Sequence, residues 1–240
     1  MNWLYYEARA LGIRTFGLPL LAVAIFVGIS WLAAYDILAT GGSAIRARHD
    51  VALGLLLLLE FGMPPVAGIA AAYLVSGNPA VELHLTLRRS YFTTTLLRLA
   101  LLTLWTMAVC AATNATVRQA GYWLAPQPSL LDQLIWLAPL LWFICAGAMF
   151  ALLLRSPVAA GAILGMIWLG ELFFRGQILE NVYLRNAYLF LTLETLPGGF
   201  APDAAWWTQS RLLLLAMAAL FLAAVAILLR RNEALLGHEA

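Results

Sequence analysis

Charge is the property that this 240-residue chain has least of. Asp, Glu, Lys and Arg together make up 11% of the residues, whereas soluble domains contain about 25%. Hydrophobic residues make up 63%, and the mean hydropathy is +0.87. A water-soluble fold of this length could not hide so much apolar surface, so the composition predicts an all-α membrane protein with several spans. Continuous runs such as LLLLAMAALFLAAVAILL exclude the short alternating segments of a membrane β-barrel.

Lysine is absent, and all 14 basic residues are Arg, which leaves a net charge of +2. The chain has no Arg-rich tail and no soluble domain, so we predict no nucleic-acid partner. Its two cysteines, Cys110 and Cys145, both fall within apolar segments. Buried thiols of this kind are expected to be packing residues rather than a disulfide or a metal pair.

Several catalytic and cofactor motifs are also missing. The sequence contains no HExxH or paired CxxC pattern for zinc and no GxxxxGK[ST] loop for ATP. The histidines lie in loops or the tail, at His49, His84 and His238. We therefore predict no catalytic residue, metal site or cofactor in this chain. If ATP drives its function, ATP and Mg²⁺ belong to a partner subunit.

What the chain does have is long apolar segments within a single domain, residues 1–240. A helix needs about 17–25 apolar residues to cross a bilayer. Six segments meet that requirement, namely Phe16–Leu38, Val51–Val75, Leu96–Ala115, Leu134–Leu154, Val158–Phe174 and Leu212–Leu229.

Two further segments are expected to lie along the membrane surface. Residues Asn2–Ile13 predict an interfacial helix before the first span, with a frayed polar terminus as the alternative. Residues 175–211 include the apolar stretch AYLFLTLETL and predict short external helices between the fifth and sixth spans. These helices either dip into the outer leaflet against protein or lie flat on the surface. Trp206 and Trp207 then resemble an aromatic belt before the sixth span.

The arginines predict which side each loop faces. Six spans put both termini on one side, and cytoplasmic loops are enriched in Lys and Arg. Placing both termini in the cytoplasm gives eight cytoplasmic and six external arginines, and puts a minimal turn at Arg155-Ser156-Pro157 inside. The cytoplasmic set is Arg9, Arg14, Arg88, Arg89, Arg98, Arg155, Arg230 and Arg231, and the external set is Arg46, Arg48, Arg118, Arg175, Arg185 and Arg211.

The most basic loop is Gly77–Arg98, between the second and third spans. Asn78-Pro79 is a helix-start signal, and Glu82 falls in the first turn, where the helix dipole favours an acid. The segment therefore predicts a short amphipathic helix that offers leucines and arginines to the groove of a soluble partner. An ordinary basic cytoplasmic loop is the alternative.

This segment resembles one in the ABC transporter permeases of the type-2 exporter family. The shared pattern is a second span, a Glu-Leu-x-Leu-x-Leu stretch, then Arg-Ser and a basic residue in the third span. Family members commonly read Leu-Pro-x-Ser-Arg here, and this chain has no proline at that point. The resemblance implies a coupling helix that docks on an ATP-binding subunit, and a second permease chain, identical or related. It implies contacts from Glu82, Leu83, Leu85, Leu87, Arg88, Arg89 and Ser90.

Polar residues inside the spans are the other candidate site. Glu60 lies within the second span just before Pro64 and Pro65, and a charge at this depth should face protein or water. The two prolines should kink or break the helix and free carbonyls beside Glu60. The group could line a transport path or serve as buried packing glue. Asn114, within the third span, is a further candidate polar residue.

Glu171 lies four residues before Arg175, which favours a local ion pair over an external gate. Gly161 and Gly165 in the fifth span form a small-xxx-small pattern that allows close helix packing, inside the bundle or between subunits.

These observations favour the permease subunit of an ATP-driven exporter in the cytoplasmic membrane, coupled to its ATPase through residues 77–98. One alternative is a channel or secondary transporter in which Glu60 binds a proton or an ion. The other is a lipid-modifying intramembrane enzyme, which would need Glu60, Asn114 and Glu171 to converge.

Overall fold

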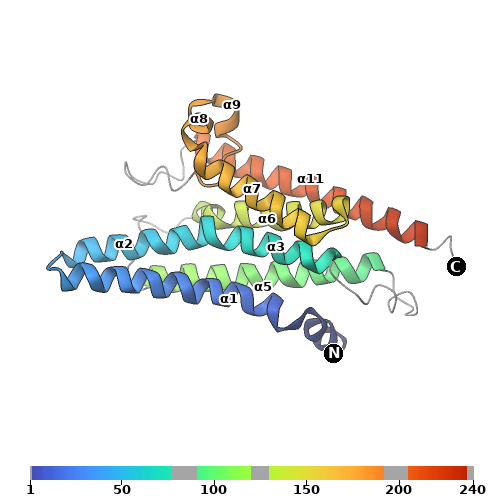
Figure 1. Cartoon of the computed structure of the whole chain (residues 1–240), viewed down its shortest axis with the longest axis horizontal. Helices are drawn as coiled ribbons and strands as arrows, with labels where there is room; N and C mark the ends of the chain where they lie inside the picture. Colours follow the sequence, from blue (N-terminus) through green and yellow to red (C-terminus); the bar gives the residue numbers. More distant parts are fainter. Residues whose placement is uncertain (1, 77–90, 120–129, 192–204, 237–240) are drawn as a thin grey trace.

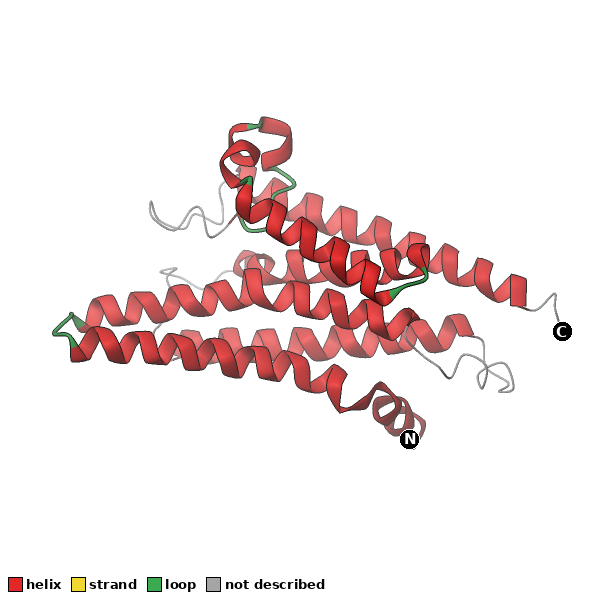
Figure 2. Ribbon diagram, in the orientation of Figure 1, coloured by secondary structure: helices red, strands yellow, loops and turns green. Residues whose placement is uncertain are grey.

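The structure, a computed structural model, describes residues 2–76, 91–119, 130–191 and 205–236 (Figure 1). Within these ranges, side chains are described from residue 17 to residue 231, except at residue 130. All regular structure in the described part is helical, as the sequence predicts (Figure 2).

The helices form an elongated bundle (Figure 1). Its long members are α1 (Asn2–Ala39), α2 (Ala44–Leu57), α3 (Met63–Ser76), α5 (Tyr91–Gln119), α6 (Leu134–Leu154), α7 (Pro157–Phe173) and α11 (Ala205–Leu236). A π-helical turn, η1 (Leu58–Gly62), joins α2 to α3, and a 3₁₀ turn, η2 (Leu130–Gln133), precedes α6. Two short helices, α8 (Arg175–Glu180) and α9 (Val182–Arg185), follow α7.

Five helical segments of the described chain are long and apolar enough to cross a membrane. They are Gly17–Ala39, Ala44–Ser76, Tyr91–Gln119, Leu131–Leu154 and Ala205–Arg231. The predicted span Val158–Phe174 corresponds to α7, which is apolar but has only 17 residues. At 1.5 Å per residue, α7 is about 25 Å long, somewhat less than a hydrocarbon core of about 30 Å.

The first helix differs from its prediction. The sequence predicts a separate interfacial helix at residues 2–13, whereas α1 is helical without interruption from Asn2 to Ala39, with Pro19 inside it. Figure 1 shows the N-terminal part of α1 turning away from the axis of the rest. Proline removes one helical hydrogen bond and commonly bends a helix, so the backbone can change direction without ending.

Two of the connecting turns follow from their local chemistry. Gly41 adopts a positive φ of 81° after α1, and the Ser43 hydroxyl accepts from the Arg46 amide at 3.2 Å to cap α2. Ser156 caps α7 in the same way through the Ala159 amide, and Pro157 occupies the first helical turn. The predicted turn at residues 155–157 is confirmed.

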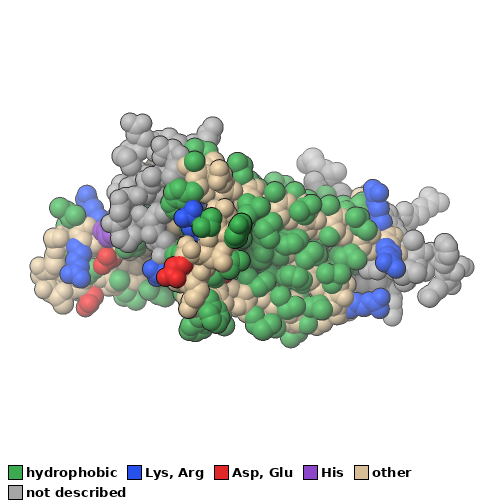
Figure 3. All heavy atoms as spheres, turned by 90° about the horizontal axis from the view of Figure 1, so that it is seen from above, with side chains coloured by type: hydrophobic (Ala, Val, Ile, Leu, Met, Phe, Trp, Pro, Cys, Tyr) green, Lys and Arg blue, Asp and Glu red, His purple; other side chains and the backbone are tan. Residues whose placement is uncertain are grey.

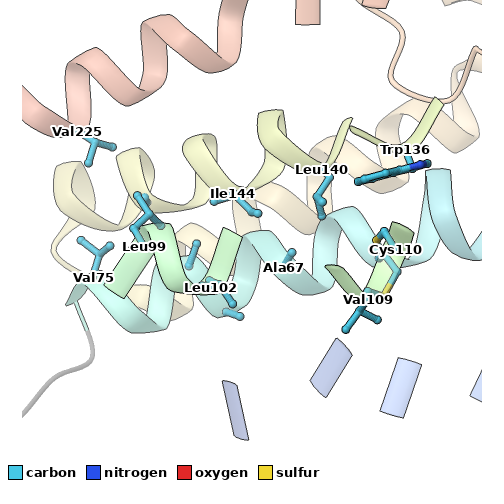
Figure 4. Close-up of a cluster of buried hydrophobic side chains, with 14 of the residues drawn as sticks. Ala67, Val75, Leu99, Leu102, Val109, Cys110, Trp136, Leu140, Ile144 and Val225 are labelled. Atoms are coloured by element: carbon cyan, nitrogen blue, oxygen red, sulfur yellow. The ribbon is translucent and has the colours of Figure 1, made fainter. Parts of the chain in front are cut away.

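The core lies where α3 packs along α6, with side chains from α5 and α11 closing over them (Figure 4). The two central helices approach closely at Gly68 and Gly147. A Cβ atom on Gly147 would overlap the carbonyl oxygen of Gly68, and one on Gly68 would overlap that of Phe143. Only glycine allows backbones to lie this close.

The glycines that the sequence singles out lie elsewhere. A Cβ on Gly161 would meet only Ile69, at 3.8 Å, and one on Gly165 would meet nothing within 4 Å. Within the described part of one chain, neither glycine marks a tight helix contact. A role between subunits stays a prediction.

Charged side chains gather toward the two ends of the bundle, with a broad apolar region between them (Figure 3). At the end where α3, α6 and α11 finish, the described charged side chains are Arg98, Arg155, Arg230 and Arg231. The described acidic side chains lie toward the opposite end or in the interior. The described charges at the first end are therefore all basic, whereas those at the opposite end include both signs.

Candidate functional site

The candidate site is built around the π-helical turn η1. Pro64 and Pro65 have no amide hydrogen, so the carbonyls of Glu60 and Phe61, four residues earlier, lose their α-helical donors. The helix widens here, and the Met63 amide donates to Leu58, five residues back. Such π-helical turns occur frequently at functional sites. This geometry agrees with the prediction that the prolines free carbonyls beside Glu60. The helical path nevertheless continues through Pro64 and Pro65.

Helix α7 uses one of the freed carbonyls. The indole nitrogen Nε1 of Trp168 donates to the Phe61 oxygen at 3.1 Å. The Phe61 and Trp168 rings are also in contact, tilted by 40° with centroids 4.5 Å apart. The π-helical turn is therefore a specific attachment point for α7.

The Glu60 side chain forms an ion pair with Arg211 of α11. The Arg211 Nη2 to Glu60 Oε1 distance is 2.5 Å, and both side chains are 0% exposed. The pairing satisfies the requirement that a charge at this depth meet an opposite charge. The pair joins two helical segments through residues that are 151 positions apart in the sequence.

Sequence reasoning missed Arg211 as a site residue. The arginine was predicted to lie in an external loop before a span starting at Leu212, but α11 starts at Ala205 and Arg211 is fully buried within it. The predicted aromatic belt is corrected in the same way, because Trp207 is also fully buried and its ring lies 5.4 Å from the Arg211 guanidinium. A sequence signal was present, since a basic partner would stabilise Glu60 within a span and Arg211 directly precedes a predicted span.

Arg211 also holds the segment that follows α9. Its Nη1 donates to the Leu189 carbonyl at 2.7 Å, while the Leu189 amide donates to Glu171 Oε2 of α7 at 2.9 Å. Leu189 is thus bonded through its carbonyl to α11 and through its amide to α7. Glu171 takes part in this network through Leu189, a contact that its spacing from Arg175 does not predict.

The residues around Leu189 form a buried wedge, defined here as Tyr188–Leu191. Their side chains are 1–3% exposed. Phe190 contacts Phe61 of the π-helical turn, with ring centroids 4.8 Å apart. In contrast, α8 and α9 contain no buried residue. Between α7 and α11, the described residues therefore comprise two exposed short helices and the buried wedge, and how this segment meets the membrane stays a prediction.

Asn114 belongs to a different polar cluster, at the end of α5. Its Nδ2 donates to Gln133 at 3.1 Å, and its Oδ1 accepts from Arg118 Nε at 3.3 Å. Arg118 in turn pairs with the buried Asp132 at 2.8 Å. The contacts of Asn114 tie the end of α5 to η2, whereas Glu60 and Glu171 lie together around Leu189.

The predicted coupling residues Glu82, Leu83, Leu85, Leu87, Arg88, Arg89 and Ser90 lie outside the described residues. The two flanks of that segment are described. The Tyr91 hydroxyl at the start of α5 donates to the Val75 carbonyl near the end of α3, at 3.2 Å. The Arg230 guanidinium of α11 lies 5.1 Å from the centre of the Phe92 ring. Helices α3, α5 and α11 are therefore connected where the segment leaves and returns.

Comparison with known protein families, with characterised proteins and with solved structures finds no significant match for this chain. The site's chemistry must therefore be inferred from its own contacts. Glu60 and Arg211 are paired and fully buried, and the bonds around Leu189 join α7 to α11. This arrangement is suited to holding helices in a fixed relation rather than to acid–base chemistry.

Proposed function

We propose that this chain is a six-pass permease subunit of an ATP-driven exporter in the cytoplasmic membrane. Two such chains, identical or related, form the transport path, and ATP with Mg²⁺ binds a separate ATPase subunit. The observation that carries the proposal is the position of the 77–90 connection. It leaves α3 and returns at α5 at the end of the bundle where the described charges are all arginine.

The arginine count supports a cytoplasmic location for that end, because the sequence assigns eight arginines to it and six to the other. Arginine near span ends is enriched on the cytoplasmic side. Arg155, Arg230 and Arg231 all follow or close helices there, and the first turns of α1 and last turns of α11 lie toward the same end (Figure 1). A soluble ATPase would meet the 77–90 connection on this side.

The contacts also provide a route by which movement of the connection reaches the rest of the bundle. The Tyr91–Val75 hydrogen bond joins α5 to α3, so force on the connection acts on both helices. Helix α3 continues into the π-helical turn, which bonds to α7 through Trp168 and to α11 through Arg211. Rigid helices joined by buried bonds are the elements through which coupling between distant sites can travel.

The burial of Glu60 favours this role over that of an ion or proton site. A transported ion must reach its site from water and leave again. Glu60 is 0% exposed and bonded to Arg211. We therefore assign the Glu60–Arg211 pair to the mechanical connection between helices.

Co-purification tests the proposal. The full chain is tagged, extracted from its native membrane in mild detergent and purified, and the co-eluting proteins are identified by mass spectrometry. We expect a soluble ATP-binding protein with the wild type and its loss from the Arg88→Glu/Arg89→Glu variant. The matched control is Arg155→Glu/Arg231→Glu, which makes the same charge change at exposed positions outside the 77–90 connection.

The control separates a specific docking segment from a general need for positive charge. Equal loss of the ATPase from both variants would contradict docking through residues 77–90. The absence of any ATP-binding protein from the wild type, even after cross-linking in the membrane, would contradict the exporter proposal itself.

A further inference from the structure

A groove lies between α1 and α2 near the turn that joins them. Its volume is about 270 Å³, and each helix lines it with four residues. Helix α1 provides Trp31, Ala34, Tyr35 and Leu38, and α2 provides Ala44, Ala47, Arg48 and Val51. Both sets follow the spacing i, i+3, i+4, i+7, so each is one complete face of a helix.

Residue size explains why the two faces leave a groove. Three of the facing residues, Ala34, Ala44 and Ala47, are too small to fill the space between the helices. The large side chains Trp31 and Tyr35 stand at the border and are 66% and 69% exposed. The groove is therefore lined mainly by carbon and opens outward along the exposed side of α1.

Arg48 supplies the groove's cationic group. Within the described residues, its side chain forms no ion pair or hydrogen bond. The guanidinium is exposed at the margin of an apolar groove and has a planar set of donors suited to a phosphate.

The surroundings indicate what kind of molecule meets this groove. Helix α1 is apolar along a segment long enough to span a membrane, and only 11% of its most apolar window is buried in the chain. Trp and Tyr are enriched at the headgroup level of a bilayer. The groove thus lies where acyl chains give way to charged headgroups.

We propose that this groove binds a bilayer phospholipid, with one acyl chain against the alanines and an anionic headgroup phosphate on Arg48. The groove is slightly smaller than the roughly 300–1,000 Å³ of sites that enclose a drug-sized ligand. That size fits part of one acyl chain rather than a whole lipid. The proposal depends on the membrane location of the chain and not on its role as an exporter.

Native mass spectrometry of the full chain in detergent provides the test. Palmitoyl-oleoyl phosphatidylglycerol is titrated as the anionic probe and the matching phosphatidylcholine as the zwitterionic probe. We expect the first phosphatidylglycerol to bind more tightly than phosphatidylcholine. Arg48→Gln should weaken phosphatidylglycerol binding roughly fivefold, the factor for one basic residue at an anionic lipid surface.

Two further variants make the test specific. Arg46→Gln removes the same charge from the same helix end, but Arg46 does not line the groove, so binding should stay unchanged. Ala44→Phe places a ring in the groove at an exposed position and should weaken binding of both lipids. Equal effects of Arg46→Gln and Arg48→Gln would overturn the proposal. The proposal would also be overturned if the chain is a dimer and Arg48→Gln leaves its lipid binding unchanged. The groove would then be assigned to contact with a second copy of the chain.

Fluorescence quenching gives a second readout that does not depend on a destabilised variant. Phosphatidylglycerol brominated on its acyl chain should quench a fraction of tryptophan emission that disappears in Trp31→Phe. The same bromination on phosphatidylcholine should quench this fraction less. Equal quenching by the two lipids would overturn the assignment of the headgroup to Arg48.

Discussion

The Glu60–Arg211 pair allows a quantitative test of how the bundle is held together. Glu60→Met and Arg211→Met each remove one charge and keep an unbranched side chain, and the double variant removes both. In the single variants, one buried charge loses its partner. Removal of one member of a buried pair typically costs about 3–5 kcal/mol, whereas replacement of both by apolar residues is often neutral.

The two single variants should lose different amounts of stability, because Arg211 makes contacts besides the one to Glu60. After Glu60→Met, Arg211 still donates to Leu189, 2.7 Å away, and stacks near Trp207. After Arg211→Met, the Leu189 carbonyl loses a charged donor, which adds about 1.5–3 kcal/mol. We therefore expect Arg211→Met to be the more destabilising change. The double variant should lose less stability than the sum of the two singles, by up to about 3 kcal/mol.

Reversible unfolding in mixed micelles with increasing SDS, followed by circular dichroism, measures these differences. Arg231→Met serves as the control, because Arg231 is exposed and its loss should change stability by less than about 0.5 kcal/mol. Additive effects of Glu60→Met and Arg211→Met, within about 0.5 kcal/mol, would refute a direct energetic pairing.

Two other predictions concern the contacts beside this pair. Gly147→Ala should destabilise the protein by about 1–3 kcal/mol in the same assay, because its Cβ overlaps the Gly68 backbone. Gly165→Ala meets no neighbour and should gain up to about 1 kcal/mol from helix propensity, so equal losses would contradict the packing. Trp168→Phe keeps the ring but removes the donor to the Phe61 carbonyl, and should cost about 1–3 kcal/mol. Trp31→Phe, on the exposed side of α1, should change stability little. Similar losses of stability in Trp168→Phe and Trp31→Phe would count against the Trp168–Phe61 hydrogen bond.

Features set by local sequence could be predicted well. Apolar runs indicate the long helices, and the turns at Ser43 and Ser156 follow from capping chemistry. The consequence of Pro64 and Pro65 is also local, because a missing amide hydrogen frees a defined carbonyl. Burial of Glu60 follows from the cost of a charge among apolar residues.

Pairings between distant residues could not be predicted from one sequence. Arg211 was excluded because a window of apolar residues begins at Leu212, whereas the helix itself begins earlier and carries Arg211 inside. Hydropathy locates the apolar part of a helix. It does not locate a helical turn that carries a charge when that charge is paired with a residue of another helix. The choice of Gly68 and Gly147 over Gly161 and Gly165 likewise depends on which faces meet, which periodicity does not fix.

The wedge illustrates the same limit. The sequence AYLFLTLETL is apolar enough for either a re-entrant or a surface segment, and composition does not separate the two. What holds Tyr188–Leu191 inside is Leu189, whose amide bonds to Glu171 of α7 and whose carbonyl bonds to Arg211 of α11. Such an arrangement becomes visible only in three dimensions.

Cross-linking from a single introduced cysteine tests the proposed function most directly. Cys110 and Cys145 are 0% and 7% exposed, so a thiol-reactive photo-cross-linker should react chiefly at an added exposed thiol. Ser90→Cys places that thiol in the proposed docking segment, and Ser43→Cys places it at the opposite end of the bundle. In native membranes, the account predicts that Ser90→Cys captures a soluble ATP-binding protein and Ser43→Cys does not. Capture of no ATP-binding protein at Ser90→Cys, or labelling of that position only from outside the cell, would contradict it.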